Sequence, residues 1–187
     1  MNSVNLYSIV SDYLKIFNDE SEDLTLLKTQ LKIRERLNDR KNFHGHIASA
    51  AIVLSPDKTK LLVVHHKFFD DWYLPGGHWE HDENDPQIAA RREAIEETGV
   101  NIAESLSYAS ATENIPLDIV TYPYSARPEK DEPFHYHHDF RYIFRARNSK
   151  LKAQMSEVNE CAWVDFGDEK LKNIARVIKK LQKFHVI

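Results

Sequence analysis

The stretch from residue 76 to residue 99 constrains the fold most, because its residues mark both ends of one helix. The 187 residues include only five glycines, and three of them lie within this stretch. Average usage of about 7% would give roughly thirteen, so each of these positions is expected to require glycine. Asp85 can cap a helix, Pro86 fits its first turn, and Gly99 supplies a left-handed terminal residue. The sequence therefore predicts a helix over residues 86–98.

One face of this predicted helix is acidic. Glu93, Glu96 and Glu97 lie within about 100° of one another around the helix axis, and Ile88 and Ile95 point to the opposite face. Each like-charged pair at this spacing destabilises a helix by about 0.2–0.5 kcal/mol, so something should compensate. Two interpretations stay open from spacing alone. The face is a solvated acidic surface, or it is a magnesium site, because hard divalent cations bind carboxylate oxygens.

The residues around these acids resemble the Nudix box at residues 77–100. That pattern is a glycine, five residues, a glutamate, seven residues, then Arg-Glu, an apolar residue, any residue, Glu-Glu, any residue, Gly and an apolar residue. Here Gly77 is followed by five residues and Glu83, and then by the run REAIEETGV at residues 92–100. Seven fixed positions matched at about 7% each give on the order of one chance in 10⁸ per window. One departure is an insertion, since eight residues rather than seven separate the glutamate from the run.

The resemblance, which extends over roughly residues 44–185, implies an α/β fold, namely a Nudix-type α/β/α sandwich with a mixed sheet. The implied reaction is hydrolysis of a diphosphate linkage in a small substrate in which a nucleoside diphosphate is joined to another group. Glu93, Glu96 and Glu97 would hold Mg²⁺, with Mn²⁺ as a substitute, or one of the three would act as the base. Arg92 would orient these acids through a salt bridge, and the Gly76 carbonyl would complete the metal shell. The substrate itself stays open.

In many relatives a further acid from a late loop joins the metals. The candidates here are Glu113, Glu129, Asp131 and Glu132, and the spacing does not choose among them. Glu80, three residues after the second glycine of the box, could add another carboxylate.

A Nudix-fold module that binds a nucleotide without hydrolysing it is the alternative function. Degenerate modules usually lose the box carboxylates or the arginine, whereas this chain keeps all of them. That favours the enzyme, and the one-residue insertion keeps the alternative open.

Substrate-binding candidates lie outside the acidic helix. If residues 135–146 form a strand, His135, His137 and Arg141 share one face, which would line the pocket. Trp79 follows the glycine pair and could stack on a base. The chain has ten histidines, so a transition-metal site also stays open. We favour histidines that are hydrogen-bonded or contact the substrate.

The hydrophobic pattern predicts the other elements and two units. Amphipathic helices are expected at 3–17 and about 20–38, and the pattern changes at Phe43. We therefore predict a helical N-terminal extension at residues 1–42, which would cap the pocket or form a homodimer contact, and a Nudix domain at 43–187. Further predicted elements are strands at 47–54, 61–66, 102–113, 115–121, 136–146 and 161–165, a loop at 122–133, and a last helix at about 168–184.

Composition restricts the location and the partners. A single cysteine, Cys161, cannot form an internal disulfide, and no signal peptide or apolar run of membrane-spanning length is visible. We therefore expect a cytoplasmic protein without membrane contact. Residues 44–147 carry 17 acidic and 10 basic side chains, a difference of −7. This argues against an extended nucleic-acid surface and favours a small nucleotide-type partner together with a cation.

Overall fold

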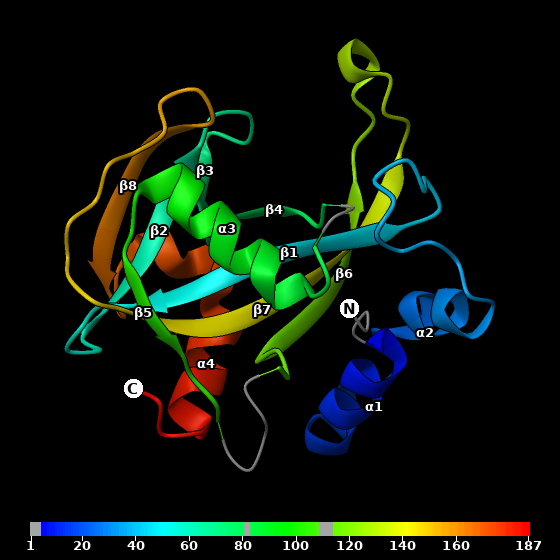
Figure 1. Ribbon diagram of the computed structural model, residues 1–187, viewed down its shortest axis with the longest axis horizontal. Helices are drawn as coiled ribbons and strands as arrows, with labels where there is room; N and C mark the ends of the chain where they lie inside the picture. The colour runs from blue at the N-terminus through cyan, green and yellow to red at the C-terminus, as the bar shows by residue number, and fades with distance from the viewer. Residues whose placement is uncertain (1–4, 81–82, 109–113) are drawn as a thin grey trace.

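The computed structural model describes residues 5–80, 83–108 and 114–187 as a mixed sheet flanked by helices (Figure 1). The helices are α1 (Leu6–Ile16), α2 (Thr25–Lys32), α3 (Pro86–Thr98) and α4 (Ala175–Lys183), with short 3-10 helices at Asn18–Glu20, Pro128–Lys130 and Glu169–Ile174. The strands are β1 (His46–Leu54), β2 (Lys60–His66), β3 (Asp71–Tyr73), β4 (Gly76–His78), β5 (Ile102–Ser105), β6 (Asp118–Tyr124), β7 (His135–Ala146) and β8 (Val158–Asp165). This arrangement confirms the predicted fold class.

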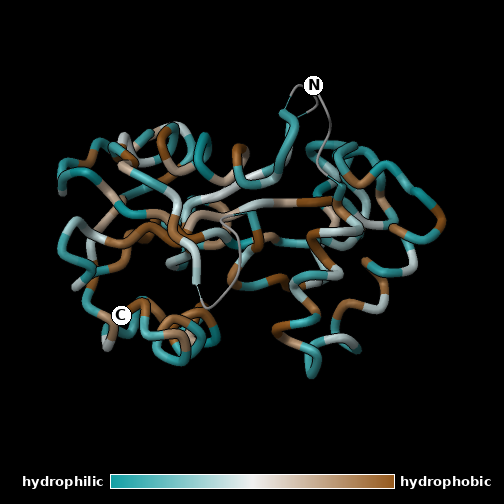
Figure 2. The backbone as a smooth tube through the Cα atoms, turned by 60° about the horizontal axis from the view of Figure 1, so that its bottom comes forward, coloured by the Kyte–Doolittle hydropathy of each residue, from teal (hydrophilic) through white to brown (hydrophobic). Residues whose placement is uncertain are grey.

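The sheet is built around a parallel pair, β1 and β7, and its other pairings are antiparallel. Its main path runs β3-β2-β1-β7-β5, with β4 paired to β1, β6 to β7 and β8 to β2. Every residue of β1 is buried, as expected for a central strand covered on both faces. Helix α3 crosses one face of the sheet and α4 lies behind it (Figure 1). Figure 2 shows hydrophobic residues along the central strands and hydrophilic residues in the outer loops.

Helix α3 has the predicted boundaries for the predicted reasons. The Asp85 carboxylate accepts a hydrogen bond from the Gln87 N–H at 2.8 Å, and Gly99 ends the helix with φ +63°. Ile88 and Ile95 face outward and are 51% and 40% exposed. The inner face consists of small residues, Ala89, Ala90 and Ala94, all fully buried, and α3 packs mainly against β1.

The N-terminal helices pack on the rest of the chain. In α1, the Tyr13 hydroxyl accepts a hydrogen bond from the Ile119 N–H of β6 at 3.1 Å and another from Lys180 of α4 at 2.7 Å. Phe17 packs edge-on against Phe184 at a centroid distance of 5.6 Å. The extension therefore shares the hydrophobic core of the domain.

Several predicted boundaries were wrong. The second N-terminal helix ends at Lys32 rather than near residue 38, because Arg34 has a left-handed backbone with φ 58°. Strand β5 ends at Ser105, and residues 109–113 lie outside the described residues. The predicted loop at 122–133 begins later, because β6 continues to Tyr124 along β7. The last helix begins as a 3-10 helix at Glu169.

Candidate active site

The glycine pair lies directly beneath helix α3. Strand β4 pairs with β1, which places Gly76 opposite Ala50. A Cβ on Gly76 would lie 2.8 Å from the Ala50 Cα, and one on Gly77 would lie 2.5 Å from the Glu93 Cδ. The Gly76 N–H donates a hydrogen bond to Glu97 Oε2 at 3.0 Å. Glycine at position 76 is therefore required by the backbone of β1, whereas a Cβ at position 77 would force the Glu93 carboxylate to move.

Arg92 holds the acidic groups of the box together. Its guanidinium contacts Glu83 at 2.8 Å, Glu93 at 2.9 Å and Glu96 at 2.9 Å, and it donates to the His78 carbonyl at 3.0 Å. The one-residue insertion has therefore not displaced Glu83 from the arginine. The expected salt bridge is present, and through His78 it also fixes the end of β4.

The three box glutamates have different surroundings. Glu97 is buried, the Glu93 side chain is largely covered, and the Glu96 side chain is 52% exposed. Burial raises the pKa of Glu97 to about 8, and the negative charges of Glu93 and Glu157 add to this, while the hydrogen bond from Gly76 opposes it. Burial also raises the pKa of Glu93, against the effect of the neighbouring arginine. Burial of one carboxyl group and partial burial of its neighbour therefore favour their protonated forms, and a bound cation would displace these protons.

Glu93 and Glu97 line a cleft of about 1800 Å³, and Glu157 lines it with them. Glu157 was not among the late acids predicted from the sequence. It is placed by the connection before β8, where the Gln154 N–H donates to the Glu97 carbonyl at 2.8 Å. No local pattern marks it, because these hydrogen bonds join segments that are far apart in the sequence.

Among the described residues, Glu132 is the one predicted late-loop acid that lines the cleft. Glu129 pairs with Arg127 at 3.2 Å and Glu132 pairs with Arg40 at 2.8 Å, although Glu132 lines the cleft. Glu113 lies outside the described residues. Glu80 lines the cleft, as suggested.

The substrate-binding residues predicted from the sequence differ in whether they line the cleft. His137 and Arg141 line the cleft, whereas His135 is buried and is not part of the lining. The Arg141 guanidinium is bonded to two carboxylates, Asp139 at 2.8 Å and Asp118 at 3.2 Å. Trp79 lines the cleft but is only 7% exposed, and its Nε1 donates to a backbone carbonyl. Most of its ring is thus covered by protein.

His78 and His137, which line the cleft, are neutral at physiological pH. Burial lowers the pKa of His137 to about 2 and that of His78 to about 3, and the charges of the neighbouring histidines contribute in both cases. Positive charge in the cleft therefore comes from arginine and lysine, such as Arg36, Arg127 and Lys130, which line it.

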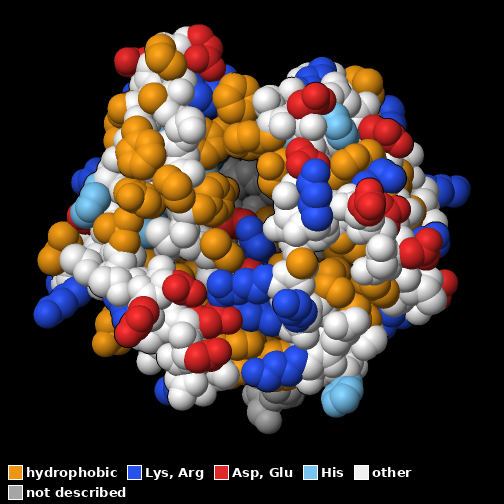
Figure 3. All heavy atoms as spheres, turned by 180° about the vertical axis from the view of Figure 1, so that it is seen from behind, with side chains coloured by type: hydrophobic (Ala, Val, Ile, Leu, Met, Phe, Trp, Pro, Cys, Tyr) orange, Lys and Arg blue, Asp and Glu red, His pale blue; other side chains and the backbone are white. Residues whose placement is uncertain are grey.

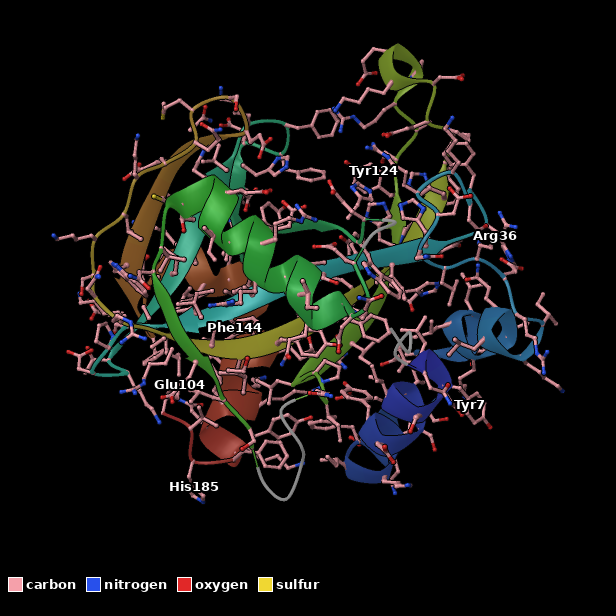
Figure 4. All side chains as sticks on the ribbon, in the orientation of Figure 1. Tyr7, Arg36, Glu104, Tyr124, Phe144 and His185 are labelled. Carbon is pink, nitrogen blue, oxygen red and sulfur yellow. The ribbon has the colours of Figure 1, made fainter. Side chains whose placement is uncertain are left out.

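Aromatic side chains of β3, β6 and the loop after β2 lie beside these cations. Phe69 lies 5.5 Å from Tyr73 and 5.9 Å from Tyr124 between ring centroids, and Arg127 lies 4.2 Å above the Phe68 ring. Phe68 and Phe69 are both exposed. Tyr124 comes from β6 and Arg36 from the connection after α2, and Figure 4 labels both. Figure 3, seen from behind, shows a hollow with hydrophobic side chains around its mouth and charged side chains at its lower edge.

Residues 45–183 match the family model described as NUDIX domain. The chain belongs to the NUDIX domain family. Nudix hydrolases generally cleave pyrophosphate bonds in nucleoside diphosphate derivatives, so this membership makes the chain a Nudix-type pyrophosphohydrolase. The family predicted from the sequence is thereby confirmed.

Solved structures share the fold. A NUDIX-family hydrolase from Clostridium perfringens is 20% identical, with a TM-score of 0.55, and the match covers 75% of this chain and 97% of that one. An Ap4A hydrolase from C. elegans is 16% identical, with a TM-score of 0.50 and coverage of 75% and 97%. A search of functionally curated proteins gave no match. Among the described residues, no helix is long and apolar enough to cross a bilayer.

Proposed function

We propose that this Nudix protein hydrolyses a diphosphate linkage in a small nucleoside diphosphate derivative, and that the reaction depends on Mg²⁺, with Mn²⁺ as a substitute. The observation that carries this proposal is the placement of Glu93 and Glu97 beside the glycine strand β4 in a large cleft, with Glu97 buried and the Glu93 side chain largely covered.

The donor set fits a hard divalent cation. Glu93, Glu97 and Glu157 offer carboxylate oxygens, and Gly76 offers a backbone carbonyl in the same cleft. The space that a Cβ on Gly77 would fill is taken by the Glu93 carboxylate. Mg²⁺ is bound by few carboxylates together with water and substrate phosphates. When bound, it would neutralise phosphate charge and lower the pKa of an attacking water.

The chain's own residues supply positioning and proton transfer. Arg92 fixes the carboxylates of Glu93 and Glu96 through its fork of donors, and the Gly76 N–H fixes Glu97. Glu96 bonds to Arg92 and lies outside the cleft lining, so it would have to turn to reach the substrate. A carboxylate of the box accepts the proton of the attacking water. Once protonated, this carboxyl group is neutral, and burial of the site favours the neutral form over the charged one.

The opposite side of the cleft suits a nucleotide. The exposed rings of Phe68 and Phe69 offer a stacking surface for a base, and Arg127 and Lys130 offer charges to phosphate. His137 can contact polar groups of the substrate. Arg141 would act on the substrate through Asp139, because its guanidinium is already paired. Trp79 would contribute only the edge that lines the cleft.

The N-terminal extension, residues 1–42, would complete the cleft. Arg36, Asn38, Asp39 and Arg40 line it, which supports the capping role more directly than the homodimer contact. A homodimer stays a prediction that the mass of the protein in solution would test.

The test is an assay of the purified protein with Mg²⁺ against nucleoside triphosphates, ADP-ribose, dinucleoside polyphosphates and nucleotide sugars. Release of a nucleoside phosphate from at least one class is expected. Binding of a nucleotide without product across the panel would favour the alternative, a nucleotide-sensing module.

A further inference from the structure

Three histidines bring ring nitrogens together at one end of the parallel strand pair. His46 of β1 lies opposite His137 of β7 in the register, and His135 precedes His137 by two residues on the same face. One ring nitrogen from each lies within 4.8 Å of the others, and all three residues are buried. We propose that His46, His135 and His137 bind one transition-metal ion of the Zn²⁺ class through their Nε2 atoms, at a site separate from the carboxylates proposed to hold Mg²⁺.

The hydrogen bonds of these rings leave the Nε2 of His46 without a donor. The Nδ1 of His135 lies 2.7 Å from the Pro133 carbonyl and that of His46 lies 3.2 Å from the Asn42 carbonyl. A carbonyl only accepts, so each Nδ1 carries a proton, and in the neutral form of such a ring the Nε2 carries the lone pair. His135 Nε2 lies 2.9 Å from His137 Nε2, and His46 Nε2 is buried with no hydrogen-bond partner in the described structure. With neutral rings, at most one proton lies among the three Nε2 atoms. A bound cation would accept their lone pairs.

The distances fit a metal after small ring rotations. Two nitrogen ligands of a tetrahedral zinc ion lie about 3.3 Å apart at the usual bond length. The Nε2 atoms of His135 and His137 are 2.9 Å apart, which is shorter than this value. The ring nitrogens of all three histidines lie within 4.8 Å of one another, so other pairs can be farther apart than this value. The backbone carbonyls that hold His46 and His135 act as the outer-shell acceptors usual for metal-binding histidines.

The ligand chemistry separates this site from the carboxylate site. Three imidazoles without a carboxylate suit zinc, copper, nickel or iron, whereas magnesium prefers oxygen. Tyr124 stacks on His137 at a centroid distance of 4.3 Å and covers one side. His137 is the member of the trio that lines the cleft. The fourth coordination position therefore opens toward the cleft, where water or a phosphate oxygen can take it.

Zinc binding by protein purified without a histidine tag tests this site directly. After chelator treatment, the protein is titrated with Zn²⁺ by calorimetry in excess Mg²⁺, and the bound metal is measured by mass spectrometry. We expect one equivalent in the wild type. His46→Gln and His135→Gln should weaken binding by more than about tenfold, since even outer-shell changes cost about 10–100-fold.

Two control variants test whether zinc binds at this histidine cluster. His65→Gln changes a histidine of β2 that is bonded to Asn159, and Glu97→Gln changes the carboxylate site. Both should retain wild-type zinc affinity. No stoichiometric zinc in the wild type, or equal affinity in His46→Gln and His135→Gln, would overturn the proposal.

X-ray absorption of the zinc-loaded wild type keeps the test independent of how the variants fold. The expected first shell contains nitrogen at about 2.0–2.1 Å with the outer scattering of imidazole rings. A shell of oxygen alone would contradict the histidine site.

Discussion

Glu97 accepts a hydrogen bond from the Gly76 N–H at 3.0 Å and thereby joins helix α3 to the strand beneath it. The two residues are 21 positions apart, and both line the same cleft. The bond fixes the carboxylate against the backbone whose carbonyl is proposed to share the metal. The geometry of the site is therefore maintained before any ligand binds, which is the condition for electrostatic catalysis.

Replacing Glu97 should abolish most of the activity while preserving the fold. Glu97→Gln keeps an acceptor for the Gly76 N–H but removes the negative charge that the metal needs. We expect turnover to fall at least about 100-fold, the scale for loss of an acid/base or metal group. Steady-state kinetics with Mg²⁺ measure this, and circular dichroism reports the fold.

The matched control is Glu104→Gln, which changes an exposed glutamate that is paired with Arg145 on β7. Its turnover should stay within about twofold of wild type, since surface changes cost little. Wild-type turnover by Glu97→Gln would remove that residue from the site.

Magnesium affinity should rise with pH. Burial raises the pKa of Glu97 from 4.5 to about 8, so the metal-free fold keeps a proton that the unfolded chain has lost between these values. The metal-free protein therefore loses stability as pH rises from about 5 to about 8. Mg²⁺ must displace this proton, so its affinity rises over the same interval and levels off above it.

Calorimetry in buffers of different ionisation heat measures this linkage. Proton release on Mg²⁺ binding should approach about one per site near pH 6.5 and vanish near pH 9. An affinity that does not change with pH, with no proton release, would contradict the buried protonated carboxyl.

Gly77→Ala should impair catalysis through Glu93. The added Cβ would lie 2.5 Å from the Glu93 Cδ, so this carboxylate must move. We expect turnover at least about tenfold slower, because a displacement of about 1 Å can cost about 100-fold. Gly167→Ala is the control, since nothing lies within 4 Å of its added Cβ. Equal turnover in both variants would show that the close approach has no catalytic consequence.

Lys180 should stabilise the attachment of the N-terminal helix. It lies 2.7 Å from both Asp118 and the Tyr13 hydroxyl, and Asp118 is fully buried. Lys180→Met should reduce the free energy of unfolding by about 3 kcal/mol, the lower end for a broken buried pair, because two arginines still contact Asp118. Urea denaturation measures the loss. Lys179→Met, at an exposed neighbouring position, should change it by less than about 0.5 kcal/mol, and equal losses would contradict the account.

Local chemistry explains what the sequence predicted well. Helix α3 was predicted to the residue because Asp85 and Gly99 satisfy the helix ends through their own side chain and backbone. The alternation along β7 predicted one shared face for His135, His137 and Arg141, since strand periodicity needs no tertiary information. His137 and Arg141 line the cleft, and His135 does not.

Tertiary contacts explain what was missed. Glu157 reaches the cleft because its segment bonds to the end of α3, and His46 joins His137 because β1 pairs with β7 in one particular register. The end of α2 depended on the single left-handed residue Arg34, a type that gives no such signal in sequence. The three-residue strands β3 and β4 are too short for a periodic pattern.

Magnesium activation of product release tests the central claim most directly. With the best substrate of the panel, the wild-type protein is assayed from chelated metal to saturating Mg²⁺, beside Glu93→Gln. The account predicts no measurable turnover in chelator, saturable activation of the wild type, and at least about 100-fold lower maximal turnover for the variant. Wild-type turnover that is unchanged in chelator, or equal activation curves for the two proteins, would contradict it.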